Sequence, residues 1–72
     1  LKISKKEHIK KIFYKLTNNS NQYRLHFRRG IGENAFALPS GDIIITDELI
    51  KFSNGDDDMV FGVLAHEVGH IE

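Results

Sequence analysis

Three consecutive isoleucines, Ile43 to Ile45, constrain the fold of this chain most strongly. β-branched side chains favour a strand, and an uninterrupted apolar run needs cover on both faces of a sheet. The run therefore predicts a central strand over residues 42–46, with a neighbouring strand at the edge. Residues 34–38 are the expected neighbour. Pro39-Ser40-Gly41 joins the two strands in a hairpin, because Pro fixes φ and Gly permits a positive φ.

A helix is expected over residues 4–16. Its apolar side chains recur with the i, i+3, i+4 and i+7 spacing of one buried stripe, namely Ile9, Ile12, Phe13 and Leu16. Ser4 and Glu7 are spaced as a capping box, and Ile3 can pack against the next turn. The polar stretch 17–21 ends the helix. A loop is preferred there over an interdomain linker, because the flanking pieces are too small to fold alone.

A strand and a short helix complete the middle of the chain. Tyr, Leu and Phe alternate with Arg, His and Arg over residues 23–28, which is the period of a half-buried strand, and Gly30-Ile31-Gly32 breaks it. His26 falls on the polar side of this alternation, so it is expected to face solvent rather than to bind a ligand. Thr46 can cap a short helix that runs through Phe52 and ends at Ser53-Asn54-Gly55.

The last segment predicts a helix from about Met59 to the end of the chain. Its buried stripe is expected to contain Val60, Val63, Leu64, Val68 and Ile71. The acidic run 56–58 lacks the alternating oxygen ligands and downstream Glu of a calcium loop, so we interpret it as the N-terminal cap of this helix. Gly69 is costly inside a helix, which suggests close approach by another backbone or by a substrate.

Composition excludes several classes of function. Lys plus Arg and Asp plus Glu number 10 each, so no net charge favours nucleic acid. The lysines of the first helix could suggest phosphate binding, but their spacing indicates a solvated face. There is no cysteine, which rules out disulfides and thiolate ligands. No apolar run reaches the ~20 residues of a membrane span. Because the chain starts at Leu, we expect a piece of a longer protein.

The candidate metal-binding and catalytic residues lie in one string, His66-Glu67-Val68-Gly69-His70. On a helix, two imidazoles four residues apart lie on one face, where both can bind one zinc ion. Glu67 lies beside that metal and can act as general base on its water, as in a metalloprotease. In the alternative interpretation, the two histidines are simply polar residues on an otherwise apolar helix.

Two strings in the right order carry a family resemblance. The chain contains Asn34-Ala35-Phe36-Ala37-Leu38-Pro39 and, after the isoleucine strand, Val63-Leu64-Ala65-His66-Glu67-Val68-Gly69-His70. Together they resemble the M48 metallopeptidase family, which includes proteases of the HtpX and Ste24 type. The resemblance covers roughly residues 8 to 72. It implies that the histidines bind zinc, that the intervening Glu activates water, and that Asn34, Ala35 and Phe36 border the peptide-binding cleft.

The sequence departs from the family pattern in three places. Ser40 replaces a common Gly, and Asp47-Glu48 replaces a more basic or glycine-containing pair. The family also takes its third zinc ligand from a Glu on a helix well downstream of the second histidine. Glu72 is a poor substitute, because at i+2 from His70 it is rotated by about 200° around the helix.

The expected architecture is α+β: a zincin-like half domain with an N-terminal helix, a small three-stranded sheet, a short helix and the active-site helix. Residues 1–72 would be the first part of a catalytic domain, truncated after that helix. The expected function is that of a zinc endopeptidase, inactive as this fragment because the third ligand is absent. The alternative is a non-catalytic module that binds peptides by strand addition.

The expected partners follow from these assignments. The substrate is a peptide or protein, and no nucleic acid is involved. Apolar surface left bare could support a dimer. The family resemblance suggests a membrane or cell-envelope location for the full-length protein, reached through segments outside this chain.

Overall fold

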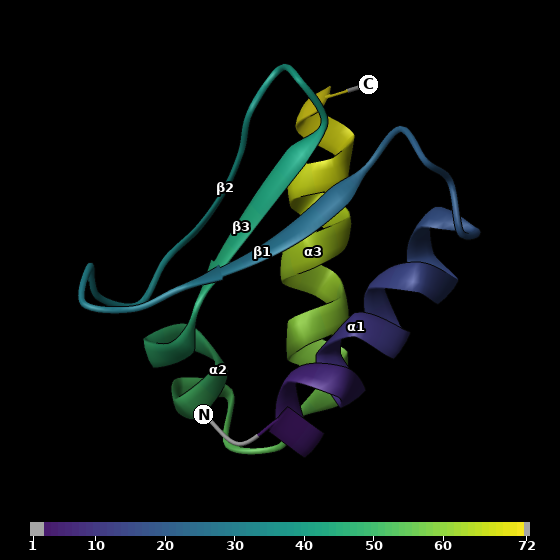
Figure 1. Ribbon diagram of the computed structural model, residues 1–72. Helices are drawn as coiled ribbons and strands as arrows, with labels where there is room; N and C mark the ends of the chain where they lie inside the picture. Colours follow the sequence, from purple (N-terminus) through teal and green to yellow (C-terminus); the bar gives the residue numbers. More distant parts are fainter. Residues whose placement is uncertain (1–2, 72) are drawn as a thin grey trace.

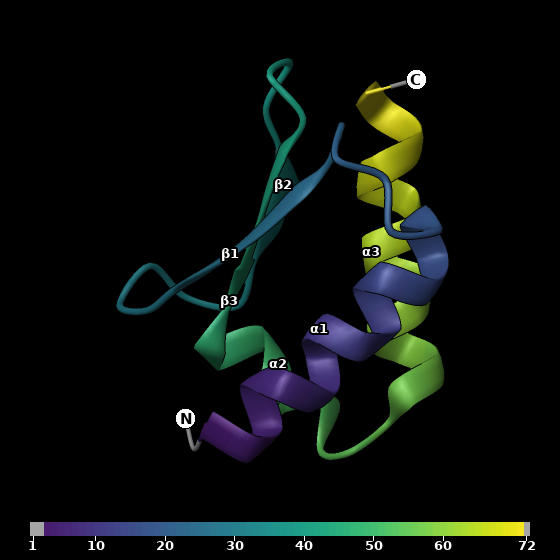
Figure 2. The same cartoon turned by 45° about the vertical axis from the view of Figure 1, so that its right-hand side comes forward.

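The computed structural model describes residues 3–71 and contains three helices and a three-stranded sheet. In chain order the elements are α1 (Ile3–Thr17), β1 (Arg24–Arg28), β2 (Ala35–Ala37), β3 (Asp42–Thr46), α2 (Asp47–Ser53) and α3 (Asp57–Ile71) (Figure 1). Figure 2 shows α1 and α3 together on one face of the sheet, and α2 at the end where β3 finishes. The predicted α+β class and order of elements are confirmed.

The isoleucine strand is central, as predicted. The strand order is β1-β3-β2, with β2 antiparallel to β3 and β1 parallel to β3. Ile43 and Ile45 are fully buried against the helices, and Ile44 on the opposite face is only 6% exposed. The predicted hairpin between residues 34–38 and 42–46 is also confirmed. Gly41 has a φ of +97° in the connection.

One core holds the sheet and the helices together. Its buried members are Ile9, Phe13, Ile43, Ile45, Ile50, Val60, Leu64 and Val68. The predicted stripe of α1 supplies the first two, and Ile12 and Leu16 pack at its margin. Helix α1 therefore packs into the same core as α3, and residues 18–23 connect α1 to β1. The side chains of Ile3 and Ser4 lie outside the described residues, and so does the predicted capping box.

The N-terminal caps of α2 and α3 are formed as predicted. Thr46 Oγ1 accepts the Leu49 amide at 3.1 Å and caps α2, and Asn54 ends that helix in the left-handed conformation with φ 49°. Asp56 Oδ1 accepts the Met59 amide at 3.1 Å. This cap starts α3 at Asp57, two residues before the predicted start.

Gly69 differs from the prediction. A Cβ built at this position would meet no heavy atom within 4 Å outside its own helix. The expectation that another backbone segment approaches it is therefore wrong for the part of the chain that the structure describes. Gly41 is the position of close approach, because its Cβ would lie 2.1 Å from the carbonyl oxygen of Gln22.

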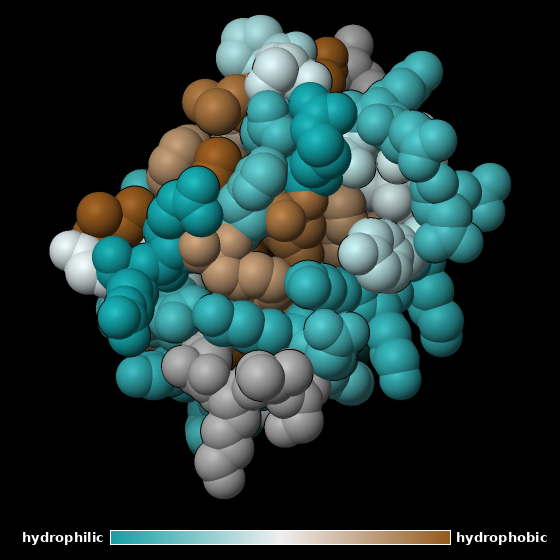
Figure 3. Space-filling model, viewed as in Figure 1, coloured by the Kyte–Doolittle hydropathy of each residue, from teal (hydrophilic) through white to brown (hydrophobic). Residues whose placement is uncertain are grey.

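The outer face of the sheet carries a polar network. Asp42 Oδ1 accepts from Arg24 Nε at 2.8 Å and lies 2.8 Å from His26 Nε2, and Ser40 Oγ donates to Asp42 Oδ2. His26 thus lies on the polar side of β1 as predicted, but it is half-buried and paired rather than simply solvated. Figure 3 shows hydrophobic side chains on the displayed face in small groups, separated by hydrophilic ones.

Within residues 3–71, no helix combines the length and the apolar character needed to cross a membrane.

Candidate metal centre and substrate groove

Helix α3 places the two histidines of the motif side by side. His66 and His70 are four residues apart, and both are exposed. Their Nε2 atoms lie 3.0 Å from each other, and the ring centroids are 4.5 Å apart with the ring planes at 86°. Since residues at i and i+4 share one face of a helix, this arrangement follows from local geometry.

The histidine pair suits a zinc ion. Two nitrogen ligands of a tetrahedral zinc, each about 2.0–2.1 Å from the metal, are roughly 3.3 Å apart. The observed separation of 3.0 Å needs only a small opening of the pair. Glu67 is half-buried, and its carboxylate lies within 4.8 Å of both imidazoles. Within residues 3–71, these three residues form the only cluster of three or more His, Cys, Asp or Glu side chains close enough to share a metal ion.

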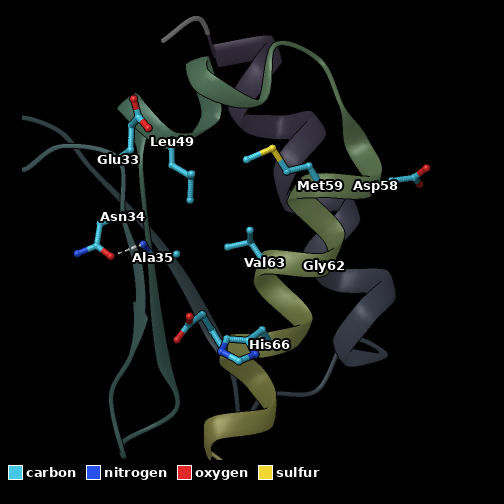
Figure 4. A pocket seen from close by; sticks show the side chains of 10 residues that line it. Glu33, Asn34, Ala35, Leu49, Asp58, Met59, Gly62, Val63 and His66 are labelled. Carbon is cyan, nitrogen blue, oxygen red and sulfur yellow. Dashed lines mark hydrogen bonds between the residues drawn. The ribbon is translucent and has the colours of Figure 1, made fainter.

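A groove leads away from His66 between α3 and the start of β2. Its volume is about 520 Å³, and its lining residues are Glu33, Asn34, Ala35, Leu49, Asp58, Met59, Gly62, Val63, His66 and Glu67. Figure 4 shows Leu49 and Ala35 on one side of the groove facing Met59 and Val63 of α3, while the Asn34 side chain points away from the groove. The groove therefore has an apolar centre and a polar end at His66.

The charges along this groove are of one sign. The charged residues that line it are Glu33, Asp58 and Glu67, with no Lys or Arg among the lining residues. The Asp58 carboxylate points away from the groove (Figure 4). An electronegative surface attracts cations and disfavours anionic side chains. The electrostatics are therefore consistent with a bound metal cation.

The free edge of β2 borders the groove. Asn34 C=O accepts the Thr46 amide at 3.0 Å, and the Leu38 amide donates to Asp42 C=O at 2.8 Å. In an antiparallel pair, alternate residues direct their backbone groups toward the partner strand. Ala35 and Ala37 therefore direct their N–H and C=O groups away from β3. The Ala35 amide instead donates to Asn34 Oδ1 at 2.9 Å (Figure 4).

The structure brings most of the predicted site residues together. His66, Glu67, Asn34 and Ala35 all line the groove, and His70 is paired with His66. Phe36 does not join them: its register with Ile44, between Ala35 and Ala37, puts its side chain on the outer face of the sheet. The family resemblance assigned Asn34, Ala35 and Phe36 to the cleft together. In a strand, however, successive side chains point to opposite faces, so Phe36 faces away from the side that Ala35 faces.

Six groove residues were not predicted to line it: Glu33, Leu49, Asp58, Met59, Gly62 and Val63. Met59 and Val63 precede His66 by seven and three residues, a spacing that places them on the same helix face. The spacing of these two residues from His66 is therefore a signal in the sequence that could have placed them in the groove. Leu49 reaches the groove from α2, and no local pattern indicates this position.

Comparisons with known proteins identify the family. Neither the curated proteins nor the solved structures include a match to this chain. The model of peptidase family M48 matches residues 4–72, which spans both the Asn-Ala strand and the histidine helix. This match is to the family as a whole, so the HtpX or Ste24 type stays a prediction. The chain belongs to peptidase family M48.

Proposed function

We propose that this chain is the part of a zinc endopeptidase that supplies two metal ligands, the general base and one wall of the substrate cleft. The observation that carries the proposal is the cluster of His66, Glu67 and His70 at the end of the groove. The M48 match supports a metalloprotease. A peptide-binding module without catalysis has no chemical need for a carboxylate at Glu67.

In this proposal, His66 and His70 hold the metal through their Nε2 atoms. Zinc bound there would polarise the scissile carbonyl and make water a better nucleophile at neutral pH. Glu67 accepts a proton from the attacking water and delivers it to the amine nitrogen that leaves. Its carboxylate is close enough to the imidazoles, within 4.8 Å, to serve a water molecule between them.

The substrate is proposed to bind along β2 as an added strand. Ala35 and Ala37 offer backbone groups that β3 does not use, and strand addition draws affinity from such groups. A neighbouring substrate side chain would enter the apolar centre lined by Leu49, Met59 and Val63. Because Glu67 lies at the end of the groove and no lining residue is basic, acidic side chains are disfavoured there.

A catalytic zinc needs three protein ligands. Glu67 is assigned to proton transfer, and Glu72 lies outside the described residues. We therefore propose that the third ligand comes from a segment of the full-length protein beyond this chain, completing a zincin-like site. The 72-residue chain alone would then be inactive. Membrane association, which the family resemblance suggests, would also depend on other segments.

The test uses the full-length protein, loaded with zinc, and fluorescently labelled casein as an unfolded substrate. Glu67→Gln should retain zinc and lose at least ~10²-fold in hydrolysis, because it keeps the shape of the site without the base. His66→Ala and His70→Ala should lose zinc and activity together. Zinc content and cleavage are measured on the same samples, with the outward-facing Phe36→Leu as control. Wild-type turnover by Glu67→Gln would overturn the mechanism.

A further inference from the structure

Thr46 connects three elements through a single hydroxyl group. Its side chain is fully buried. Thr46 Oγ1 accepts the Asn34 amide at 2.9 Å and the Leu49 amide at 3.1 Å, and it donates to the Asn34 carbonyl oxygen at 3.0 Å. The Thr46 amide also donates to that same carbonyl at 3.0 Å. One residue at the end of β3 therefore binds the residue before β2 and caps α2.

These bonds join the start of β2 to the first turn of α2, two of the segments that line the groove. Asn34 and Leu49 both line the groove, whereas Thr46 does not. Asn34 immediately precedes Ala35, whose backbone faces the free edge. Beyond its role as a helix cap, the Thr46 hydroxyl thus sets the distance between the edge of β2 and the apolar side chain that α2 contributes.

We propose that Thr46 is a positioning residue for substrate binding: it holds the β2 edge and Leu49 in place along one side of the groove. This inference rests on the proposed function, because it assigns the substrate to that edge. Thr46 touches neither the substrate nor the histidine pair, so its loss should affect binding rather than proton transfer. The effect should appear in KM and not in kcat or zinc content.

Two substitutions separate the hydroxyl from the rest of the side chain. Thr46→Val keeps the shape and removes every bond made by Oγ1. Thr46→Ser keeps the hydroxyl and removes only a methyl group. Thr17→Val is the matched control: Thr17 is also buried, and its Oγ1 donates to the Phe13 carbonyl at 3.0 Å, but it lies at the end of α1 away from the groove. A general loss of stability would affect both valine variants.

Two measurements on the full-length, zinc-loaded protein test the proposal. The first is amide hydrogen exchange of Asn34 and Leu49. The second is the kinetics on an internally quenched peptide that copies a site cleaved in casein. Thr46→Val should accelerate exchange at both amides by at least about tenfold and raise KM by roughly 5- to 10-fold, because it removes the three hydrogen bonds of Oγ1, each with a modest net contribution. Zinc content and kcat should stay within about threefold of wild type. Thr46→Ser should restore both, and Thr17→Val should change neither.

The outcomes separate this inference from the proposed function. A Thr46→Val protein that exchanges Asn34 like wild type, or that keeps its KM, overturns the positioning role. If Thr46→Val does not fold, Thr46→Ser decides: a KM raised by about 5- to 10-fold in the serine variant would show that the hydroxyl is not the determinant. If the wild-type protein binds zinc but does not cleave casein, the endopeptidase proposal fails. Exchange at Asn34 would then still show whether Thr46 holds the strand.

Discussion

Gly41 occupies a position where the fold leaves no room for a side chain. Its φ of +97° lies in the region that residues with a Cβ rarely adopt, and an added Cβ would lie 2.1 Å from the Gln22 carbonyl oxygen. The Arg24 amide donates to the Gly41 carbonyl at 2.9 Å, so the hairpin connection also aligns β1. Glycine at this position therefore permits both the turn and the pairing of β1 with β3.

Gly41→Ala should lower the free energy of unfolding by about 2 kcal/mol or more, from backbone strain together with the clash. Gly32→Ala is the matched control. Gly32 also has a positive φ, +82°, but nothing lies within 4 Å of its Cβ position. Urea denaturation of both variants isolates the clash. Equal destabilisation by the two substitutions would show that close approach to Gln22 does not matter.

Asp42 is the acidic residue with the strongest local partners. Hydrogen bonds from Arg24, Ser40 and His26 stabilise its ionised form and hold the pKa of Asp42 well below its ordinary value. A depressed pKa means that the unfolded state takes up the proton first as the pH falls. The contribution of Asp42 to stability is therefore complete above the unfolded pKa of about 3.9 and is lost progressively at lower pH.

Wild-type protein should thus lose more stability between pH 5 and pH 3 than Asp42→Asn, which has no such proton to bind. Unfolding midpoints in urea across this range provide the comparison, and Glu33→Gln serves as a control at an exposed carboxylate. Parallel pH profiles for wild type and Asp42→Asn would contradict the assignment of the network to Asp42.

At the scale of elements, β2 and α3 contribute different kinds of groups to the candidate site. Helix α3 carries the histidine pair, Glu67 and the groove residues Met59 and Val63 on contiguous faces. Strand β2 contributes backbone groups, since Ala35 and Ala37 point them away from β3. The proposed metal binding and the proposed substrate contacts can therefore be tested separately.

Ala35→Pro should weaken peptide binding without displacing zinc. Proline removes the Ala35 amide, which does not pair with β3 but faces the edge and donates to Asn34 Oδ1. In the full-length enzyme, KM should rise while the zinc content stays at the wild-type level. Phe36→Pro is the contrasting variant, because Phe36 pairs with Ile44 in the register of the two strands. Proline there removes a backbone amide that faces β3, and this should disrupt the sheet. Unchanged KM in Ala35→Pro would argue against strand addition.

At the scale of the whole molecule, the proposed zinc site is expected to take only part of its ligands from this chain. His66 and His70 supply two nitrogen ligands, and each missing ligand removes part of the binding energy. The 72-residue chain should therefore bind zinc more weakly than nanomolar at neutral pH. Isothermal titration calorimetry measures this, with His70→Ala as the control. Nanomolar 1:1 binding by the monomer would reveal a further ligand among these residues.

The surface leaves one prediction open. Tyr14, Ile31, Leu38, Phe52 and Phe61 are large apolar side chains that remain exposed on different elements. Single exposed apolar residues are common on monomeric proteins, whereas contiguous patches mark interfaces. A dimer through apolar surface, as expected from the sequence, stays a prediction that sedimentation of the purified chain can test.

The sequence by itself determined the features that depend on neighbours along the chain. The isoleucine run predicted a central strand, and the caps at Thr46 and Asp56 follow from side chains that reach their own backbone. The proximity of His66 and His70 is likewise a property of any α-helix. The two caps and the histidine pair span at most four residues, so a local pattern is sufficient to reveal them.

Tertiary structure alone decided which distant residues meet. The parallel pairing of β1 with β3 places His26 beside Asp42. The entry of Leu49 into the groove depends on the orientation of α2, and the exclusion of Phe36 depends on the register of β2. Strand pairing and helix packing are selected by burial of the shared core, a sum over the whole chain. A shift of one residue in register would exchange the faces of β2, and no pattern within residues 34–38 specifies which face meets α3.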